Sequence, residues 1–229
     1  YKYNKKLNNF LINLIKSKPI YSFKSLDKFI HQVWAINQNK NLENLIKKIK
    51  KIYVCDGHHR LQGMIKNKKK ISSMIVAFPH NQIQILDYNR VVKSEFSKTK
   101  ILNIISRNFI IKKIKNKSKK LKKGLFNMYM NKQWYSLNYN KKNNDLDVKI
   151  LHENILSKIK IKNIDYISGL KDPYFLKKMV NTNKFNIAFM LFPTDIKSVI
   201  KIADKRKFMP PKSTWFHPKP LDGLISFEI

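Results

Sequence analysis

Short apolar runs alternate with segments of helical periodicity along this chain, and that alternation restricts the fold more than any other feature. Apolar side chains at helical spacing predict helices within residues 4–16, 42–51, 59–67, 94–109, 146–159, 172–180 and 194–207. Runs rich in β-branched and aromatic residues predict strands at 52–56, 71–79, 83–93, 125–130, 133–139, 164–170 and 185–193, with a turn at Asn131-Lys132. We therefore expect an α/β or α+β fold, with a mixed sheet and flanking helices.

A lysine-rich tract at residues 112–124 interrupts this pattern. Runs of like charge are typical of solvated linkers or loops. We therefore expect a first domain at 1–111, a linker at 112–124, and a C-terminal α/β subdomain at 125–229. The subdomain ends in a proline-rich tail, "MPPKSTWF", and a final strand.

The charge is extreme, with 48 basic and 14 acidic side chains and a formal net charge of +34. A basic surface attracts phosphate backbones, which favours a nucleic-acid partner. AT-rich coding gives the opposing interpretation, because it favours lysine, asparagine and isoleucine together without selecting a partner. The lysines are scattered evenly and arginine occurs only four times, so we expect no nucleic-acid partner.

Cysteine content and hydropathy indicate which cellular compartment and which kinds of site suit the chain. Cys55 is the only cysteine, so no internal disulfide can form, and a reducing cytoplasm fits. No run of eighteen apolar residues predicts a membrane span. No cysteine or histidine cluster has the spacing of a zinc site, so we expect no bound metal of that kind. The chain starts with Tyr1 rather than methionine, so we expect an upstream portion to be missing.

The segment "IYVCDGHHRLQGMI", residues 52–65, carries the main functional signal. It reads as a strand, an Asp56-Gly57 turn and a helix. The first N–H groups of a helix lack partners and carry the positive end of its dipole, which suits an anion. Gly57 allows a close approach of the ligand, while His58, His59 and Arg60 add donors, Arg60 as a two-pronged fork.

Two other interpretations of this segment remain open. Asp56 can simply cap the helix, which requires no ligand. The two histidines can instead bind a metal, although adjacent helical residues point about 100° apart, which makes a shared ion awkward. We favour phosphate because an arginine kept in a lysine-rich chain indicates a need for its planar fork.

Two further segments can contribute to the same site. In the tail, Lys212, Ser213 and Thr214 follow two prolines that stiffen the backbone, an arrangement suited to phosphate or carboxylate. The alternative is a packed crossover anchored by Met209, Trp215 and Phe216.

Arg90, in "LDYNR", either reaches the site or pairs with Asp87, whereas Arg107 has the context of ordinary helix surface. We expect Arg90 and the tail to lie near His58, His59 and Arg60.

Three motifs together carry a resemblance to a known family. "YVCDGHHR", "LDYNRVVK" and "MPPKSTWFHPKPLDGL" occur in the order seen in the bacterial family of domain of unknown function 1015, and the terminal motif is long and specific. Through "DGHHR" the family resembles the ParB/sulfiredoxin-like superfamily, which includes kinases of free serine. The resemblance implies a ParB/sulfiredoxin-like core, with Asp56, His58 and His59 catalytic and Gly57 and Arg60 at the donor phosphates.

The resemblance also implies a catalytic glutamate upstream of "DGHHR", in a half of the family's length that precedes Tyr1. The chain is then a fragment or the product of a truncated gene. Within the chain, Asp56 is the best candidate for the general base, by position only.

The leading functional hypothesis is a small-molecule kinase acting on a serine-like hydroxyl, with a nucleotide or polyphosphate donor and Mg²⁺ implied by the resemblance. The alternatives are a non-catalytic ParB-like module that binds nucleotide or nucleic acid, and an inactive remnant.

Overall fold

The computed structural model describes residues 1–26, 28–66, 73–117, 121–141 and 145–226. The chain forms two compact units, Tyr1–Ile83 with Pro220–Ile229 and Gln84–Lys219, called here the first and second unit. Both contain helices and strands, and the strands pair in antiparallel sheets, which confirms the expected α/β or α+β class. Within the described ranges, no helix has the length and apolar character needed to cross a membrane.

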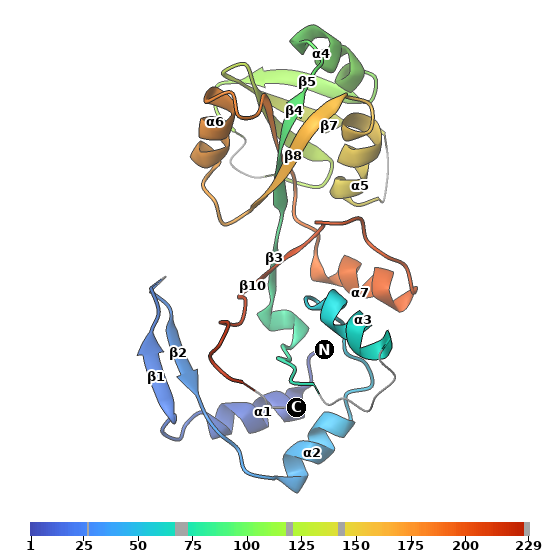
Figure 1. The fold of residues 1–229 in the computed structure, drawn as a ribbon. Coiled ribbons are helices and arrows are strands. Elements are labelled where there is room, and N and C mark those ends of the chain that lie inside the picture. The colour runs from blue at the N-terminus through green and yellow to red at the C-terminus, as the bar shows by residue number, and fades with distance from the viewer. Residues whose placement is uncertain (27, 67–72, 118–120, 142–144, 227–229) are drawn as a thin grey trace. The chain divides into compact units, whose positions relative to one another are not determined.

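The first unit is built mainly of short helices, shown in blue to cyan in Figure 1. Asparagine side chains start two of them: Asn4 accepts a hydrogen bond from the Leu7 N–H, and Asn39 accepts one from the Leu42 N–H. The elements are α1 (Lys5–Leu14), β1 (Tyr21–Lys24), β2 (Ile30–Val33), α2 (Lys40–Lys47), α3 (His58–Lys66) and the 3₁₀ turn η1 (His80–Gln82). α1 packs against α2, and Leu7 and Leu45 are buried there.

Two strands predicted in the first unit are wrong. Residues 52–56 and the described part of 71–79 belong to no strand, while residues 71 and 72 lie outside the described ranges. Their apolar side chains are largely exposed, among them Ile52, Val54, Ile75 and Val76. β-branched residues favour strands because they fit a pleated, half-buried surface, and neither run has a partner strand to provide one.

A six-stranded antiparallel sheet organises the second unit, in the order β5-β7-β6-β9-β4-β8. A separate pairing of β10 with β3 joins the tail to the start of the unit. The strands are β3 (Gln84–Leu86), β4 (Tyr88–Ser94), β5 (Phe109–Ile114), β6 (Leu125–Met130), β7 (Gln133–Tyr139), β8 (Ile161–Ser168), β9 (Ile187–Met190) and β10 (Trp215–His217). The tight turn expected between β6 and β7 is confirmed: Asn131 and Lys132 both have a positive φ, as a type I′ hairpin turn requires.

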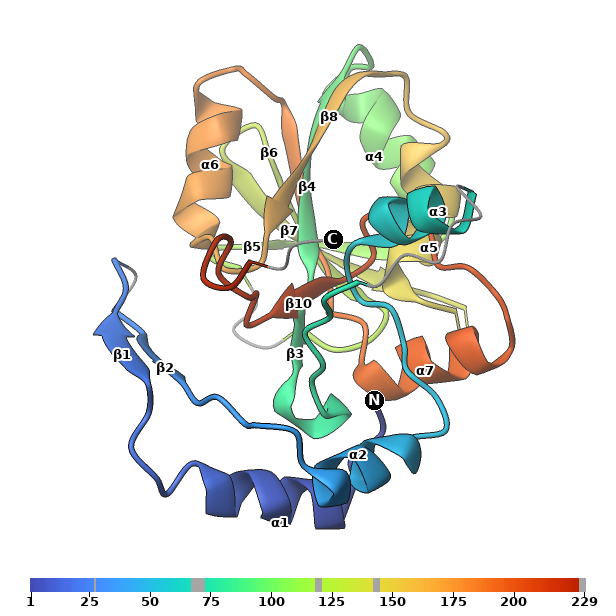
Figure 2. The same ribbon diagram turned by 60° about the horizontal axis from the view of Figure 1, so that its bottom comes forward.

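Helices cover both faces of this sheet (Figure 2). α4 (Lys98–Ser106), α5 (Asp147–Leu151) and the π-helical turn η2 (His152–Leu156) pack on one face, and α6 (Pro173–Asn181) packs on the other. α7 (Ile196–Asp204) follows the last sheet strand. Side-chain caps begin three of these helices, from Ser97 for α4, Asp172 for α6 and Asp195 for α7. The helices predicted at 172–180 and 194–207 thus begin close to their caps, whereas the helix predicted at 94–109 was too long, because Ser94 ends β4 and Phe109 begins β5.

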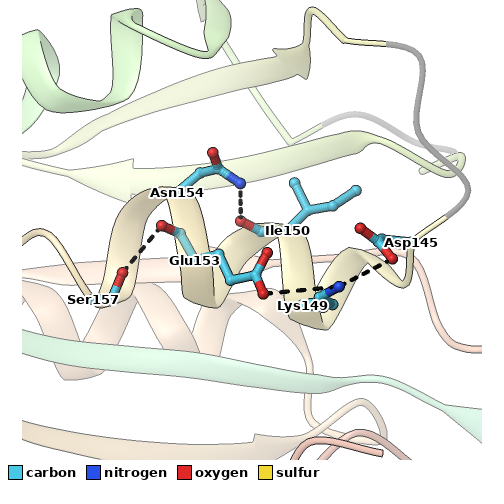
Figure 3. A network of polar contacts seen from close by, with 6 residues as sticks. All are labelled: Asp145, Lys149, Ile150, Glu153, Asn154 and Ser157. Carbon is cyan, nitrogen blue, oxygen red and sulfur yellow. Dashed lines mark hydrogen bonds and ion pairs between the residues drawn. The ribbon is translucent and has the colours of Figure 1, made fainter.

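Figure 3 shows how polar contacts hold the continuous stretch of α5 and η2. Lys149 pairs with Asp145 at 3.3 Å and with Glu153 at 3.9 Å, one helical turn to either side. Asn154 donates to the Ile150 carbonyl at 2.9 Å, and Ser157 donates to the Glu153 carbonyl at 3.1 Å. The Asn154 and Ser157 side chains thus bind backbone oxygens of the preceding turn along the π-helical stretch.

The lysine tract predicted as a linker at residues 112–124 lies within the second unit. β5 takes in Lys112 and Lys113, and pairs them with Ser136 and Tyr135 of β7. β5 is an edge strand, and lysines on an edge discourage pairing with a strand of another chain. Residues 118–120 of the tract, like residues 227–229 of the expected final strand, lie outside the described ranges.

Candidate functional site

The Asp56-Gly57 turn and the helix that follows it are confirmed. Gly57 has a φ of +80°, a left-handed conformation that side chains with a Cβ rarely adopt. Its carbonyl accepts the first helical hydrogen bond from the Leu61 N–H at 3.1 Å, and α3 begins at His58. The glycine is therefore required by the backbone at the point where α3 starts.

Arg60 lies back over this helix start. A Cβ built on Gly57 would be 3.6 Å from Nη2 and 3.7 Å from Nε of Arg60, so the guanidinium occupies the space beside the glycine. The N–H groups of His58, His59 and Arg60 belong to the first turn, where no helical carbonyl precedes them. The fork thus lies at the same helix start as N–H groups that have no partner within the helix, and this arrangement can hold a phosphate-like anion.

Asp56 and the histidines flank that place. The Asp56 carboxylate accepts a hydrogen bond from the Gly57 N–H at 2.8 Å, and it stands one residue before the position of the helix cap, which Gly57 fills. His58, His59 and Arg60 all have exposed side chains. Leu61 and Ile65, expected on an apolar face of α3, are 42% and 70% exposed, so this helix has no buried face.

The described residues do not supply the three or more ligands that a protein-held metal site for these histidines would use. Among the described residues, no group of three or more His, Cys, Asp or Glu side chains is close enough to bind one ion.

Arg90 is buried, at 2% exposed, and its donors are directed at backbone carbonyls. Nη1 donates to the Tyr88 carbonyl, and Nη2 donates to the Lys212 carbonyl at 2.9 Å. The guanidinium also lies 5.5 Å from the centre of the Tyr166 ring. Burial lowers the pKa of Arg90 to about 10, although the neighbouring Tyr166 and Asp87 act in the opposite direction. Arg90 thus fastens the "PPKST" loop to β4.

The three tail residues lie in different environments. The Ser213 hydroxyl is buried and donates to the Pro210 carbonyl. Lys212 is exposed, has a φ of +55°, and places Nζ 5.6 Å from the centre of the Tyr88 ring. Thr214 is partly exposed. Lys212 and Thr214 are therefore the loop residues with side chains open to a ligand.

Two aromatic neighbours of Arg90, Tyr88 and Tyr166, were missed as candidates by sequence reasoning. Tyr88 packs edge-on against both Tyr166 and Trp215, with ring centres 6.4 Å and 5.4 Å apart. Trp215 packs here as the crossover interpretation of the tail expects. Burial raises the pKa of Asp87 from 3.8 to about 6, while Arg90 acts to lower it. Tyr166 comes from β8, and no short-range pattern announces that its strand pairs with β4 at Arg90.

The two sets of candidate residues belong to different compact units. Residues 56–60 lie in the first unit, and Arg90 and Lys212–Thr214 lie in the second. The expectation that they lie near one another stays a prediction.

Comparison with known proteins gives the chain its family. Residues 1–166 match the family described as "Protein of unknown function (DUF1015)", which is more than half of the chain. The chain belongs to the DUF1015 family. No curated protein sequence matches it.

The DUF1015 chain is also similar to several solved structures. One is described as a conserved hypothetical protein from Pyrococcus furiosus, at 17% identity and a TM-score of 0.47, covering 93% of this chain and 82% of that one. A second is a mutant of free serine kinase in complex with AMP, at 15% identity and a TM-score of 0.47, covering 94% of this chain and 81% of that one. A mutant of the same kinase in complex with ADP has 14% identity and a TM-score of 0.45, with the same coverage.

Proposed function

We propose that this chain is a phosphotransferase-like protein that binds a phosphate donor at residues 56–60. The observation that carries the proposal is the Arg60 guanidinium beside Gly57 at the start of α3. A two-pronged cation next to unpaired helical N–H groups matches the charge and the hydrogen-bond geometry of a phosphate. The glycine leaves the backbone open to close approach.

Each residue of the segment then has a part in the transfer. Arg60 and the N–H groups of the first turn hold the donor phosphates, and His58 and His59 donate to the phosphoryl group as charge builds on it. Asp56 acts as the base that takes the proton of the acceptor hydroxyl. The transfer forms an oxygen–phosphorus bond to the acceptor and breaks the bond to the leaving nucleotide or polyphosphate.

The phosphoryl acceptor and the phosphate donor are proposed from the sequence motifs. "DGHHR" resembles the segment of the free serine kinases, so we propose a small hydroxyl-bearing acceptor, serine first, a nucleotide donor, and a cytoplasmic location. Mg²⁺ needs only one or two carboxylates when phosphates complete its coordination, and Asp56 is the carboxylate in this segment. Bound Mg²⁺ would neutralise charge on the phosphates.

Within the second unit, we propose Lys212 and Thr214 as phosphate ligands. Their side chains are open, whereas the Ser213 hydroxyl is engaged by Pro210 and Arg90 is buried. Arg90 contributes by holding the Lys212 backbone in place.

Replacing Arg60 by lysine tests the donor site while keeping the charge. Arg60→Lys loses the fork, so the affinity for ADP, measured by calorimetry, should fall about tenfold or more. Arg206→Lys is the matched control, since Arg206 is exposed in the second unit. Unchanged ADP affinity in Arg60→Lys would refute the phosphate role.

A turnover assay separates a kinase from a non-catalytic module. Incubation with ATP and serine should yield phosphoserine and ADP in equal amounts. Binding of ADP without any phosphoserine from any small hydroxyl compound would instead support the non-catalytic alternative.

A further inference from the structure

A basic groove runs along α4 in the second unit. Its volume is about 710 Å³, and its lining includes Phe96, Lys100, Asn103, Ile104, Arg107 and Lys158. Small-molecule sites typically have volumes of about 300–1,000 Å³, so the groove has the size of such a site. It shares no residue with the segment at 56–60.

Three of the polar lining residues lie in a row along one side of α4 and its C-cap. Lys100, Asn103 and Arg107 follow one another at spacings of three and four, which places them in a row. Lys100 and Arg107 are two turns apart, about 10.5 Å along the axis. Lys158 comes from the chain just after η2, which packs against α4. The groove therefore presents cations at both ends of the row and from a second element.

No ion pair within the described residues neutralises these cations. The carboxylates nearest in sequence are taken by other lysines: Glu95 pairs with Lys160 at 2.5 Å, and Glu153 pairs with Lys149 at 3.9 Å (Figure 3). In the described part of the chain, no ion pair engages Lys100, Arg107 or Lys158, and all three are exposed. Three unpaired cations facing one groove repel one another, and a bound anion would relieve that repulsion.

The aromatic ring of the groove does not offer a stacking surface. Nζ of Lys100 lies 3.7 Å from the centre of the Phe96 ring, so a cation covers that face. Proteins that hold single-stranded nucleic acid combine a long basic path with open aromatic faces, and this groove is only two helical turns long. Its ligand must be recognised through its anionic groups, to which the Arg107 fork and the Asn103 amide can donate.

We propose that this groove is a second anion site, which binds a small molecule carrying two or more phosphate groups. The lysine side chains and the Arg107 fork bind separate phosphates of the same molecule. The site is independent of the donor site at residues 56–60 and of any catalysis there.

Titration with inorganic tripolyphosphate, followed by calorimetry on the full chain, tests the proposal. The titration uses an Arg60→Gln background, so that binding at residues 56–60 contributes little. Saturable binding at one site is expected. Adding Arg107→Gln and Lys158→Gln together should weaken it about a hundredfold, about tenfold for each charged donor lost. Arg107→Lys should give a smaller loss, because the charge stays and the fork goes.

The matched control removes the same charge elsewhere. Lys197→Gln with Lys201→Gln takes two exposed lysines from α7, one helical turn apart, and should leave the affinity unchanged. An equal loss in both double variants would mean that tripolyphosphate responds only to net charge, and would overturn the proposal. Absence of saturable binding to the Arg60→Gln chain would overturn it as well. Because Arg107 and Lys158 are exposed, circular dichroism of their variants should show unchanged folding.

Discussion

Replacing Gly169, just after β8, by alanine should destabilise the second unit. Its N–H donates to the Asp87 carbonyl at 2.9 Å, so the two backbones lie in close contact. A Cβ added at Gly169 would lie 2.7 Å from Asp87 Oδ1, 3.0 Å from the Asp87 carbonyl oxygen and 3.2 Å from Leu86 Cβ. The carboxylate can rotate away, but the carbonyl and Leu86 belong to a backbone fixed by strand pairing. The segment must therefore shift to admit one methyl group.

The cost of that shift sets the size of the effect. Forcing an extra methyl group into a packed site typically costs about 1–3 kcal/mol. Rotation of the carboxylate also moves it relative to Arg90, whose charge acts to lower the pKa of Asp87. We therefore expect Gly169→Ala to reduce the free energy of unfolding by about 1–3 kcal/mol.

Urea denaturation measured by tryptophan fluorescence can test this, because Trp134 and Trp215 report on the second unit. Gly63→Ala is the control: it lies inside α3, and its new Cβ would meet no atom within 4 Å. Alanine is the better helix former, so this change should stabilise its helix by up to about 1 kcal/mol. A Gly169→Ala chain as stable as the parent would show that the close contact with Asp87 imposes no constraint.

Two further predictions concern buried charges of the second unit. Burial raises the pKa of Asp147 from 3.8 to about 6, although the hydrogen bond from the Gly124 N–H acts to lower it. The protonated carboxyl therefore stabilises the folded chain fully below pH 3.8, and this stabilisation is lost as the pH rises through about 6. In Asp147→Asn, the unfolding free energy should therefore fall less between pH 3.8 and about 6, with a difference of at most about 3 kcal/mol. Urea denaturation at several pH values can measure this, and an unchanged pH profile would contradict it. Arg90→Gln should lower the stability by about 2–4 kcal/mol, because it leaves the carbonyls of Tyr88 and Lys212 without their donor. Arg107→Gln removes an exposed charge and should change the stability little, so equal losses in the two variants would show that the bonds of Arg90 are not stabilising.

Local chemistry explains the parts of the fold that the sequence predicted well. The turn at Gly57, the hairpin at Asn131-Lys132 and the helix starts at Asp172 and Asp195 each depend on residues within a few positions of one another. In each case the conformation is favoured before any tertiary contact forms. The start of α3 is also determined by local residues, and for this reason the candidate donor site could be predicted from the sequence.

Strands depend on partners that lie far away in the chain. The runs at 52–56 and 73–79 have the composition of strands, yet no neighbour pairs with them in the described structure. The tail shows the reverse, because Trp215–His217 becomes a strand only by pairing with residues 84–86. Composition indicates that a segment fits a sheet, and pairing across more than a hundred residues decides whether it joins one.

Arg90 and Arg107 show the same limit at the level of function. Sequence context suggested a site for Arg90 and plain helix surface for Arg107. Arg90 is 2% exposed and its donors bind two carbonyls, one of them 122 residues away, so its fork stabilises the fold. Arg107 is exposed in a groove whose neighbouring acids bind other lysines, which leaves its fork available to a ligand. The availability of a donor depends on which acceptors the tertiary structure places around it, and a motif does not contain that information.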